Sequence, residues 1–77
     1  MQPATGDSLI NNIRAEMARR RVDQGDIARL LGLSRNAVSD RLRGRSRIQL
    51  DELQAIATFL QVPLEQLLAP ADAEVPA

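Results

Sequence analysis

The apolar residues of this chain recur at the spacing of helices. Ile10, Ile13 and Met17 form an i, i+3, i+7 stripe, which predicts a helix over about residues 8–20. No useful alternation of apolar and polar residues appears, so we expect no sheet. The pattern therefore predicts an all-α bundle of five short helices, over about residues 8–20, 24–31, 35–43, 50–60 and 63–69.

Residues suited to helix ends bracket these segments. Gly32 and Gly44 are placed to end the second and third helices, because only glycine adopts positive φ at little cost. Pro63 suits the first position of the fifth helix. The candidate N-caps are Asp7 or Ser8, Asp23 and Ser34 for the first three helices. The residues expected to face inward are Ile27, Ala28 and Leu31, then Val38 and Leu42, then Leu50, Leu53, Ile56, Ala57 and Leu60.

Composition narrows the classes of protein that fit. The chain has 77 residues, enough for one small domain, which we expect over 8–69 between a flexible segment 1–7 and a flexible acidic tail 70–77. It has no Cys and no His, which removes disulfides, thiolate metal sites and the usual general base. We therefore expect no enzyme activity, no metal and no cofactor. The sequence shows neither a signal peptide nor a membrane-spanning run, so we expect a cytoplasmic protein that does not bind membranes.

The formal net charge of zero conceals a segregation of charge. All ten basic residues are Arg and lie in 14–47 among only four acids, a local charge of +6. Residues 34–47 alone hold five Arg against one Asp. Such a cluster on a small domain indicates a surface for a polyanion, although a run of charge can also be a solvated helical face. The nucleic-acid interpretation therefore needs support from the layout of the helices.

That layout is a helix-turn-helix. Two short predicted helices, 24–31 and 35–43, are separated by the tight turn of residues 32–34, and small Ala28 allows them to approach closely. Here the sequence resembles the lambda-repressor-like, Cro-type (XRE) helix-turn-helix domains, over roughly residues 9–69. The matching residues are Gln24, Ile27-Ala28, Leu31-Gly32-Leu33-Ser34, Ala37-Val38-Ser39, Gly44, Leu50, Leu53, Ile56-Ala57, Leu60, Val62 and Leu67-Leu68.

Two departures from the family pattern have physical interpretations. Family members often pair an Arg of the first helix with a Glu of the third, where this chain has Met17 and Leu42. Replacing both partners of a buried ion pair with apolar groups is often neutral or stabilising, so we expect these two to pack together. Arg41 stands where the family often has an aromatic residue. Its stem is expected to cover the core, the alternative being that it reaches the ligand backbone.

The resemblance implies that the third helix enters the major groove of DNA. Arg35 would then make bidentate hydrogen bonds with guanine, and Asn36 would make them with adenine. Ser39 is a further candidate base contact. Asp40 can accept from cytosine, although an ion pair that orients Arg43 or Arg35 is the favoured role for it. The expected base contacts are thus Arg35, Asn36, Ser39 and Asp40.

A second set of residues is expected to hold the DNA backbone. Gln24 is the family's phosphate contact at the start of the second helix, where N–H groups and the helix dipole attract anions. The helix cap Ser34 and the basic loop after the third helix complete a set of Gln24, Ser34, Arg43, Arg45 and Arg47. Most of the other arginines, which are Arg14, Arg19, Arg20, Arg21 and Arg29, are expected to be solvated.

The resemblance also implies a partner and an assembly. One such domain reads few base pairs, so we expect a homodimer on a pseudo-palindromic double-stranded operator, with no small-molecule ligand. The candidate dimer residues are Phe59, Val62, Leu64 and Leu68, with Leu67 expected in the core. The alternative is that all of them close the core.

The favoured function is a small Cro-like repressor of phage or prophage type that acts at the bacterial nucleoid. A restriction–modification controller protein is a second possibility, because fold alone does not choose among regulators. An antitoxin that uses the same fold to bind a protein is the alternative from another class.

Overall fold

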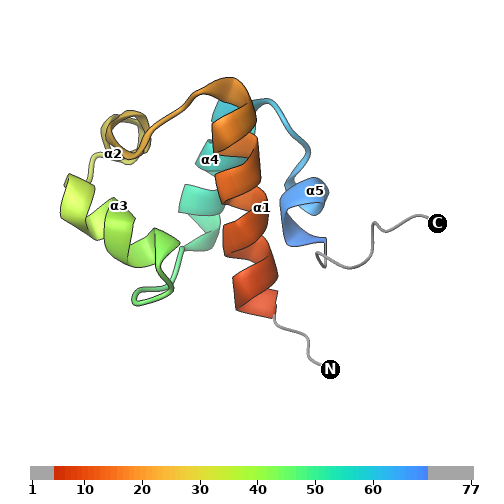
Figure 1. Ribbon diagram of the computed structural model, residues 1–77, viewed down its shortest axis with the longest axis horizontal. Helices are drawn as coiled ribbons and strands as arrows, with labels where there is room; N and C mark the ends of the chain where they lie inside the picture. The colour runs from red at the N-terminus through yellow and green to blue at the C-terminus, as the bar shows by residue number, and fades with distance from the viewer. Residues whose placement is uncertain (1–4, 70–77) are drawn as a thin grey trace.

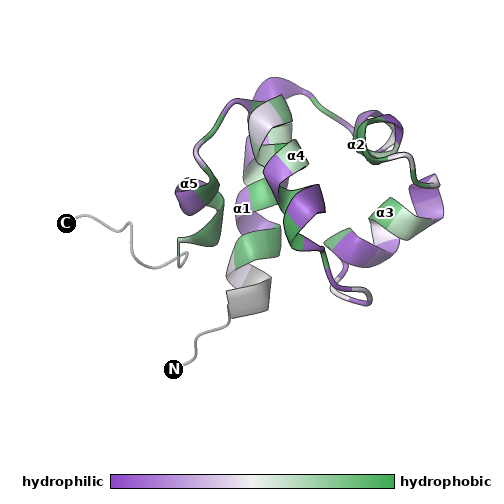
Figure 2. Ribbon diagram, turned by 180° about the vertical axis from the view of Figure 1, so that it is seen from behind, coloured by the Kyte–Doolittle hydropathy of each residue, from purple (hydrophilic) through white to green (hydrophobic). Residues whose placement is uncertain are grey.

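The computed structural model describes residues 5–69, and these form five helices without a strand. They are α1 (Thr5–Arg20), α2 (Gln24–Leu31), α3 (Arg35–Leu42), α4 (Leu50–Leu60) and α5 (Leu64–Leu68). α2 and α3 lie on one side of α1 and α5 lies on the other, as both ribbon views show (Figures 1 and 2). The prediction of an all-α, five-helix bundle is confirmed. No helix in this part of the chain has the length and apolar character that crossing a membrane requires.

Several predicted helix ends are corrected by the structure. α1 begins at Thr5, so Asp7 and Ser8 lie inside it and do not precede it as caps. α3 ends at Leu42, and Gly44 makes the turn beyond it with a φ of +80°. Pro63 is the residue before α5 and not its first residue. Of the two segments expected to be flexible, 1–4 and 70–77 lie outside the described residues, whereas 5–7 belong to α1.

One apolar core joins all five helices. Most of the predicted inward residues are buried there, and Leu31 and Leu33 pack on it from the edge. Leu50 was expected to face inward but is 62% exposed, because it opens the first turn of α4, beyond the reach of the core. The buried apolar residues are Ile13, Met17, Ile27, Ala28, Val38, Leu42, Leu53, Ile56, Ala57, Leu60, Val62 and Leu67. Met17 and Leu42 thus both lie in the core, as expected from two apolar residues at the positions of the family's frequent Arg–Glu pair.

Polar side chains of α1 fasten α5 to it. Asn12 donates from Nδ2 to the carbonyl oxygens of Leu67 (2.9 Å) and Ala69 (2.8 Å) at the end of α5. Glu16 is only 5% exposed and accepts from Gln66 of α5 at 2.9 Å. Arg19 and Arg20 pair with the same carboxylate, so this buried charge is compensated.

Candidate nucleic-acid interface

The turn between α2 and α3 is built from local capping interactions. Asp23 accepts from the N–H of Asp26 at 2.9 Å, and its own N–H donates to the Asp26 carboxylate at 3.0 Å, a capping box that starts α2. Gly32 ends α2 with a φ of +70°. Ser34 Oγ then accepts from the N–H of Ala37 at 3.1 Å and starts α3. The caps predicted at Asp23, Gly32 and Ser34 are therefore confirmed.

α3 has one face in the core and one face in solvent. Val38 and Leu42 are buried, whereas Arg35 and Asn36 are exposed at its N-terminal end. Ser39 and Asp40 are half-buried. The hydropathy colouring shows hydrophilic segments of α3 interrupted by hydrophobic ones (Figure 2). The four candidate base contacts thus lie on one short helix, with Arg35 and Asn36 the most accessible.

Arg35 lies against the first turn of α2. A Cβ atom placed on Gly25 would be 2.5 Å from Nη2 of Arg35, so the guanidinium covers the bare Cα of that glycine. The N–H of Asp26 lowers the pKa of the Asp23 carboxyl below 3.8, and the positive charges of Arg35 and Arg29 lower it further against a partial desolvation. The structure therefore brings Arg35 to the same turn as Gln24, a candidate backbone contact that begins α2.

The basic loop after α3 folds back on the end of that helix. The carbonyl oxygen of Asp40 accepts from the N–H groups of Arg45 (2.8 Å) and Ser46 (3.3 Å). The expected ion pair from the Asp40 carboxylate to Arg43 or Arg35 does not form among residues 8–69. Asp40 thus positions the loop through its backbone, which leaves its side chain available to a ligand.

The ten arginines divide into two groups of five. Within the part of the chain that the structure describes, one group makes side-chain hydrogen bonds or ion pairs, namely Arg14, Arg19, Arg20, Arg29 and Arg41. The other group makes none there and is exposed, namely Arg21, Arg35, Arg43, Arg45 and Arg47. Four of the five free cations are those assigned to DNA from the sequence. Positive charge not neutralised within the protein therefore gathers at α3 and its following loop.

Arg41 makes an ion pair with α4 that neither role considered from the sequence included. Its Nε and Nη2 donate to the two carboxylate oxygens of Glu52 in α4, at 2.9 and 3.2 Å, and Nη1 donates to the carbonyl of Ala37. The hydrogen bond from Arg41 lowers the pKa of Glu52 below its ordinary value of 4.5, although burial opposes this. This bidentate pair ties α3 to α4 and withdraws Arg41 from the ligand.

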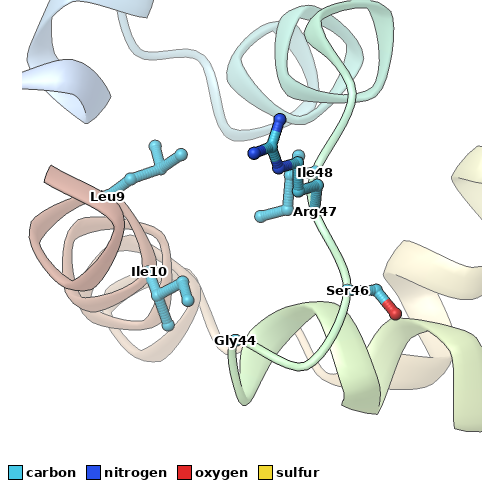
Figure 3. A pocket seen from close by; sticks show the side chains of 6 residues that line it. All are labelled: Leu9, Ile10, Gly44, Ser46, Arg47 and Ile48. Carbon is cyan, nitrogen blue, oxygen red and sulfur yellow. The ribbon is translucent and has the colours of Figure 1, made fainter.

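Arg47 of the basic loop is next to a small groove. With Ser46 and Ile48 it borders a groove of 240 Å³ between the loop and α1, completed by Leu9, Ile10 and Gly44. In the close view the side chains of Leu9, Ile10, Arg47 and Ile48 line this space, while the hydroxyl of Ser46 points to the opposite side of the loop (Figure 3). Ser46 and Arg47, which are neighbours in the loop, thus point in different directions.

Sequence reasoning overlooked two residues. Arg14 belongs to the set of arginines of which most were expected to be solvated; it is exposed, but it also donates from Nε and Nη2 to the carbonyl of Leu42, at 3.3 and 2.9 Å. No sequence signal points to this bond, because its partner is a backbone atom 28 residues away. Gly25 is in contact with the guanidinium of Arg35, and here a signal exists, because glycine is unfavourable inside a helix. Among the described residues no cluster of metal-ligating side chains occurs.

The candidate dimer residues divide by exposure. Phe59 and Leu68 are 43% and 49% exposed, and Leu64 is half-buried against the core. Val62 is only 9% exposed, because it packs into the core directly after α4, so it adds almost nothing to a surface. Leu67 is fully buried, as expected. α5, which carries Leu64 and Leu68, lies on the far side of α1 from α2 and α3 (Figure 1).

Comparison with known proteins supplies the family. No curated protein and no solved structure matches the chain significantly. The model of the Helix-turn-helix family of Cro/C1 type matches residues 13–67, which include α2, α3 and α4 completely and α5 as far as Leu67. Proteins of this family are DNA-binding regulators of transcription and are generally not enzymes. Because the match covers most of its length and α2 and α3 form the expected helix-turn-helix, the chain belongs to the Cro/C1-type (XRE) helix-turn-helix family.

Proposed function

We propose that this protein is a sequence-specific regulator of transcription that inserts α3 into the major groove of double-stranded DNA. One observation carries the proposal. Four of the five arginines that make no side-chain hydrogen bond or ion pair among residues 8–69 lie on α3 and the loop after it. A surface that keeps its cations unpaired in the free protein attracts a polyanion without first breaking internal ion pairs.

Base recognition is assigned to the exposed side of α3. Arg35 and Asn36 are suited to bidentate hydrogen bonds with guanine and adenine, each worth about 1–3 kcal/mol of discrimination. Ser39 and Asp40 lie one turn further along the helix and are less exposed. Because the Asp40 carboxylate has no arginine partner within the described residues, it is available to accept from the N4 amino group of cytosine.

Backbone contacts are assigned around this helix. Gln24 begins α2, and Ser34 caps α3. Arg43, Arg45 and Arg47 supply the charge that binds phosphates in any sequence. Arg47 must swing out of its groove to take part, which its exposed side chain allows.

A second copy of the chain completes the assembly. One domain presents a single recognition helix, and two related by a twofold axis read a pseudo-palindromic operator. Phe59 and Leu68 are exposed apolar residues on α4 and α5, two helices that pack together, and half-buried Leu64 adjoins them. This surface is separate from α3, so a dimer contact there leaves both recognition helices free. The activity favoured is that of a small Cro-like repressor acting at the nucleoid.

Selection from a random pool of duplexes tests the proposal. Purified protein is expected to enrich a pseudo-palindromic sequence and to bind it more tightly than a scrambled duplex in fluorescence anisotropy. With about four to five phosphate contacts per monomer, the slope of log affinity against log salt is about −0.9 for each contact. Failure to enrich any sequence, or an affinity independent of salt, would show that the exposed arginines serve another purpose.

A further inference from the structure

Gly25 is an unexpected residue at its position. It lies in the first turn of α2 and is buried, and its φ is outside the left-handed region that favours glycine. Glycine destabilises a helix relative to alanine, because it loses more backbone freedom on folding. The backbone geometry therefore gives no reason for glycine here, and the reason must lie in what surrounds the Cα atom.

The three heavy atoms nearest to a Cβ atom built on Gly25 all belong to the side chain of Arg35. A Cβ atom added there would meet Nη2 of Arg35 at 2.5 Å, Cζ at 3.1 Å and Nε at 3.2 Å. All three atoms belong to the guanidinium, so this group occupies the space that a side chain at position 25 would need. Because a guanidinium is the far end of a flexible side chain, a Cβ would displace it and leave the helices in place.

Charge strengthens this contact. Asp26 of the same turn is already paired with Arg29 at 2.5 Å, which leaves the carboxylate of Asp23 as the negative charge facing Arg35. The guanidinium is thus attracted electrostatically to the turn and fits it sterically. It remains exposed, so it is accessible to DNA while it is held there.

We propose that Gly25 is a positioning residue for DNA recognition: its missing side chain forms a seat that holds the Arg35 guanidinium at the N-terminal end of α3 before DNA arrives. The proposal rests on the proposed function, in which Arg35 contacts DNA. An arginine that is ordered in the free protein loses less rotamer entropy on binding. Gly25 therefore increases affinity without touching DNA itself.

A double-mutant cycle tests the coupling. Wild type, Gly25→Ala, Arg35→Ala and the double variant are titrated against the duplex enriched by selection. Gly25→Ala is expected to weaken binding about two- to tenfold, the equivalent of ordering one long side chain. In the Arg35→Ala background the same change is expected to have no effect, because the seat has no occupant. Asn36→Ala is the matched control background, in which Gly25→Ala keeps its full effect.

The outcomes separate the inference from the function. If Arg35→Ala alone leaves affinity unchanged, the proposed DNA contact of Arg35 is wrong. Two results would refute the positioning role of Gly25 even if Arg35→Ala weakens binding. One is that Gly25→Ala leaves the affinity unchanged; the other is that Gly25→Ala lowers the affinity equally in the wild-type and Arg35→Ala backgrounds. A lowered thermal midpoint of Gly25→Ala would indicate a structural role, whereas we expect an unchanged or higher midpoint since alanine favours the helix.

A measurement on the wild-type protein needs neither a variant nor DNA. Relaxation of the ¹⁵N nuclei of arginine Nε–H groups reports side-chain motion on the picosecond to nanosecond timescale. Arg35 is expected to be more ordered than Arg45, which is also exposed and has no side-chain partner within residues 8–69. Equal mobility of the two groups would refute the proposal that Gly25 positions Arg35, independently of any result with DNA.

Discussion

The guanidinium of Arg14 in α1 donates to the carbonyl oxygen of Leu42, the last residue of α3, from both Nε (3.3 Å) and Nη2 (2.9 Å). The last carbonyl oxygens of a helix lack intrahelical donors and carry partial negative charge. A guanidinium there supplies both the hydrogen-bond donors and the positive charge. α3 is thereby tied to α1 at one residue, as Arg41 ties it to α4. The helix assigned to base recognition is held at its C-terminal half by two arginines that are not free for DNA.

Arg14→Ala is expected to lower the free energy of unfolding by about 1–2 kcal/mol, since a hydrogen bond from a charged group is lost and a helix carbonyl loses its partner. Urea unfolding followed by circular dichroism measures the change. Arg21→Ala is the matched control, because Arg21 is exposed, directly follows the same helix and makes no side-chain bond among residues 8–69. Equal losses in the two variants would mean that the Leu42 contact contributes nothing to stability.

The Arg41–Glu52 pair predicts a dependence of stability on pH. Arg41 lowers the pKa of Glu52 in the folded protein, so the ionised form is favoured by folding. That contribution is complete above the ordinary value of 4.5 and is lost as the pH falls through the lowered pKa of the folded state. Stability is therefore expected to fall between about pH 5 and pH 2.

Glu52→Gln isolates this contribution. Glutamine retains an oxygen that can accept from the N–H of Gln49, so the start of α4 is preserved while the charge is removed. Urea midpoints measured across the acid range should decline less steeply in the variant than in wild type. Asp23, whose pKa is also lowered, maintains part of the slope in both proteins. Parallel curves would show that the pair is not coupled to folding.

Arg35 and Arg45 are expected to contribute to DNA binding in different ways. Arg35→Ala should weaken binding to the selected duplex by about 1–3 kcal/mol and change binding to a random duplex little, because a base contact is lost. Arg45→Ala should weaken both alike and reduce the salt slope by about one contact, because a phosphate contact is lost. Anisotropy titrations at several salt concentrations measure both. Equal losses on both duplexes for Arg35→Ala would refute base recognition by Arg35.

The exposed apolar residues of α4 and α5 are expected to determine assembly. Phe59→Glu and Leu68→Glu should each shift the protein towards monomer and weaken binding to a full pseudo-palindrome more than to a half-site. Leu50→Glu is the control, because Leu50 is 62% exposed but lies at the opposite end of α4 from Phe59. Sedimentation velocity gives the oligomeric state. A wild-type protein that stays monomeric both free and on the operator would exclude the dimer.

Local signals sufficed for most of the fold. The caps at Asp23 and Ser34 and the left-handed Gly32 depend on atoms within four residues, so sequence reasoning located them correctly. The all-α class followed from apolar spacing for the same reason. The errors at Thr5, Pro63 and Leu50 all occur at helix ends, where propensity is weak and packing decides which residue continues the helix.

The sequence by itself determined the number and order of the helices, the helix-turn-helix and the concentration of arginine near it, because these follow from spacing and from residue type. Only the tertiary structure decided which arginines remain free. Arg14 and Arg41 find partners 28 and 11 residues away, and Arg35 lies on a glycine of the preceding helix. These contacts depend on how helices are oriented after the core forms. The number of arginines in the sequence does not distinguish between them, whereas the folded structure gives some of them internal partners and leaves the others without an ion pair.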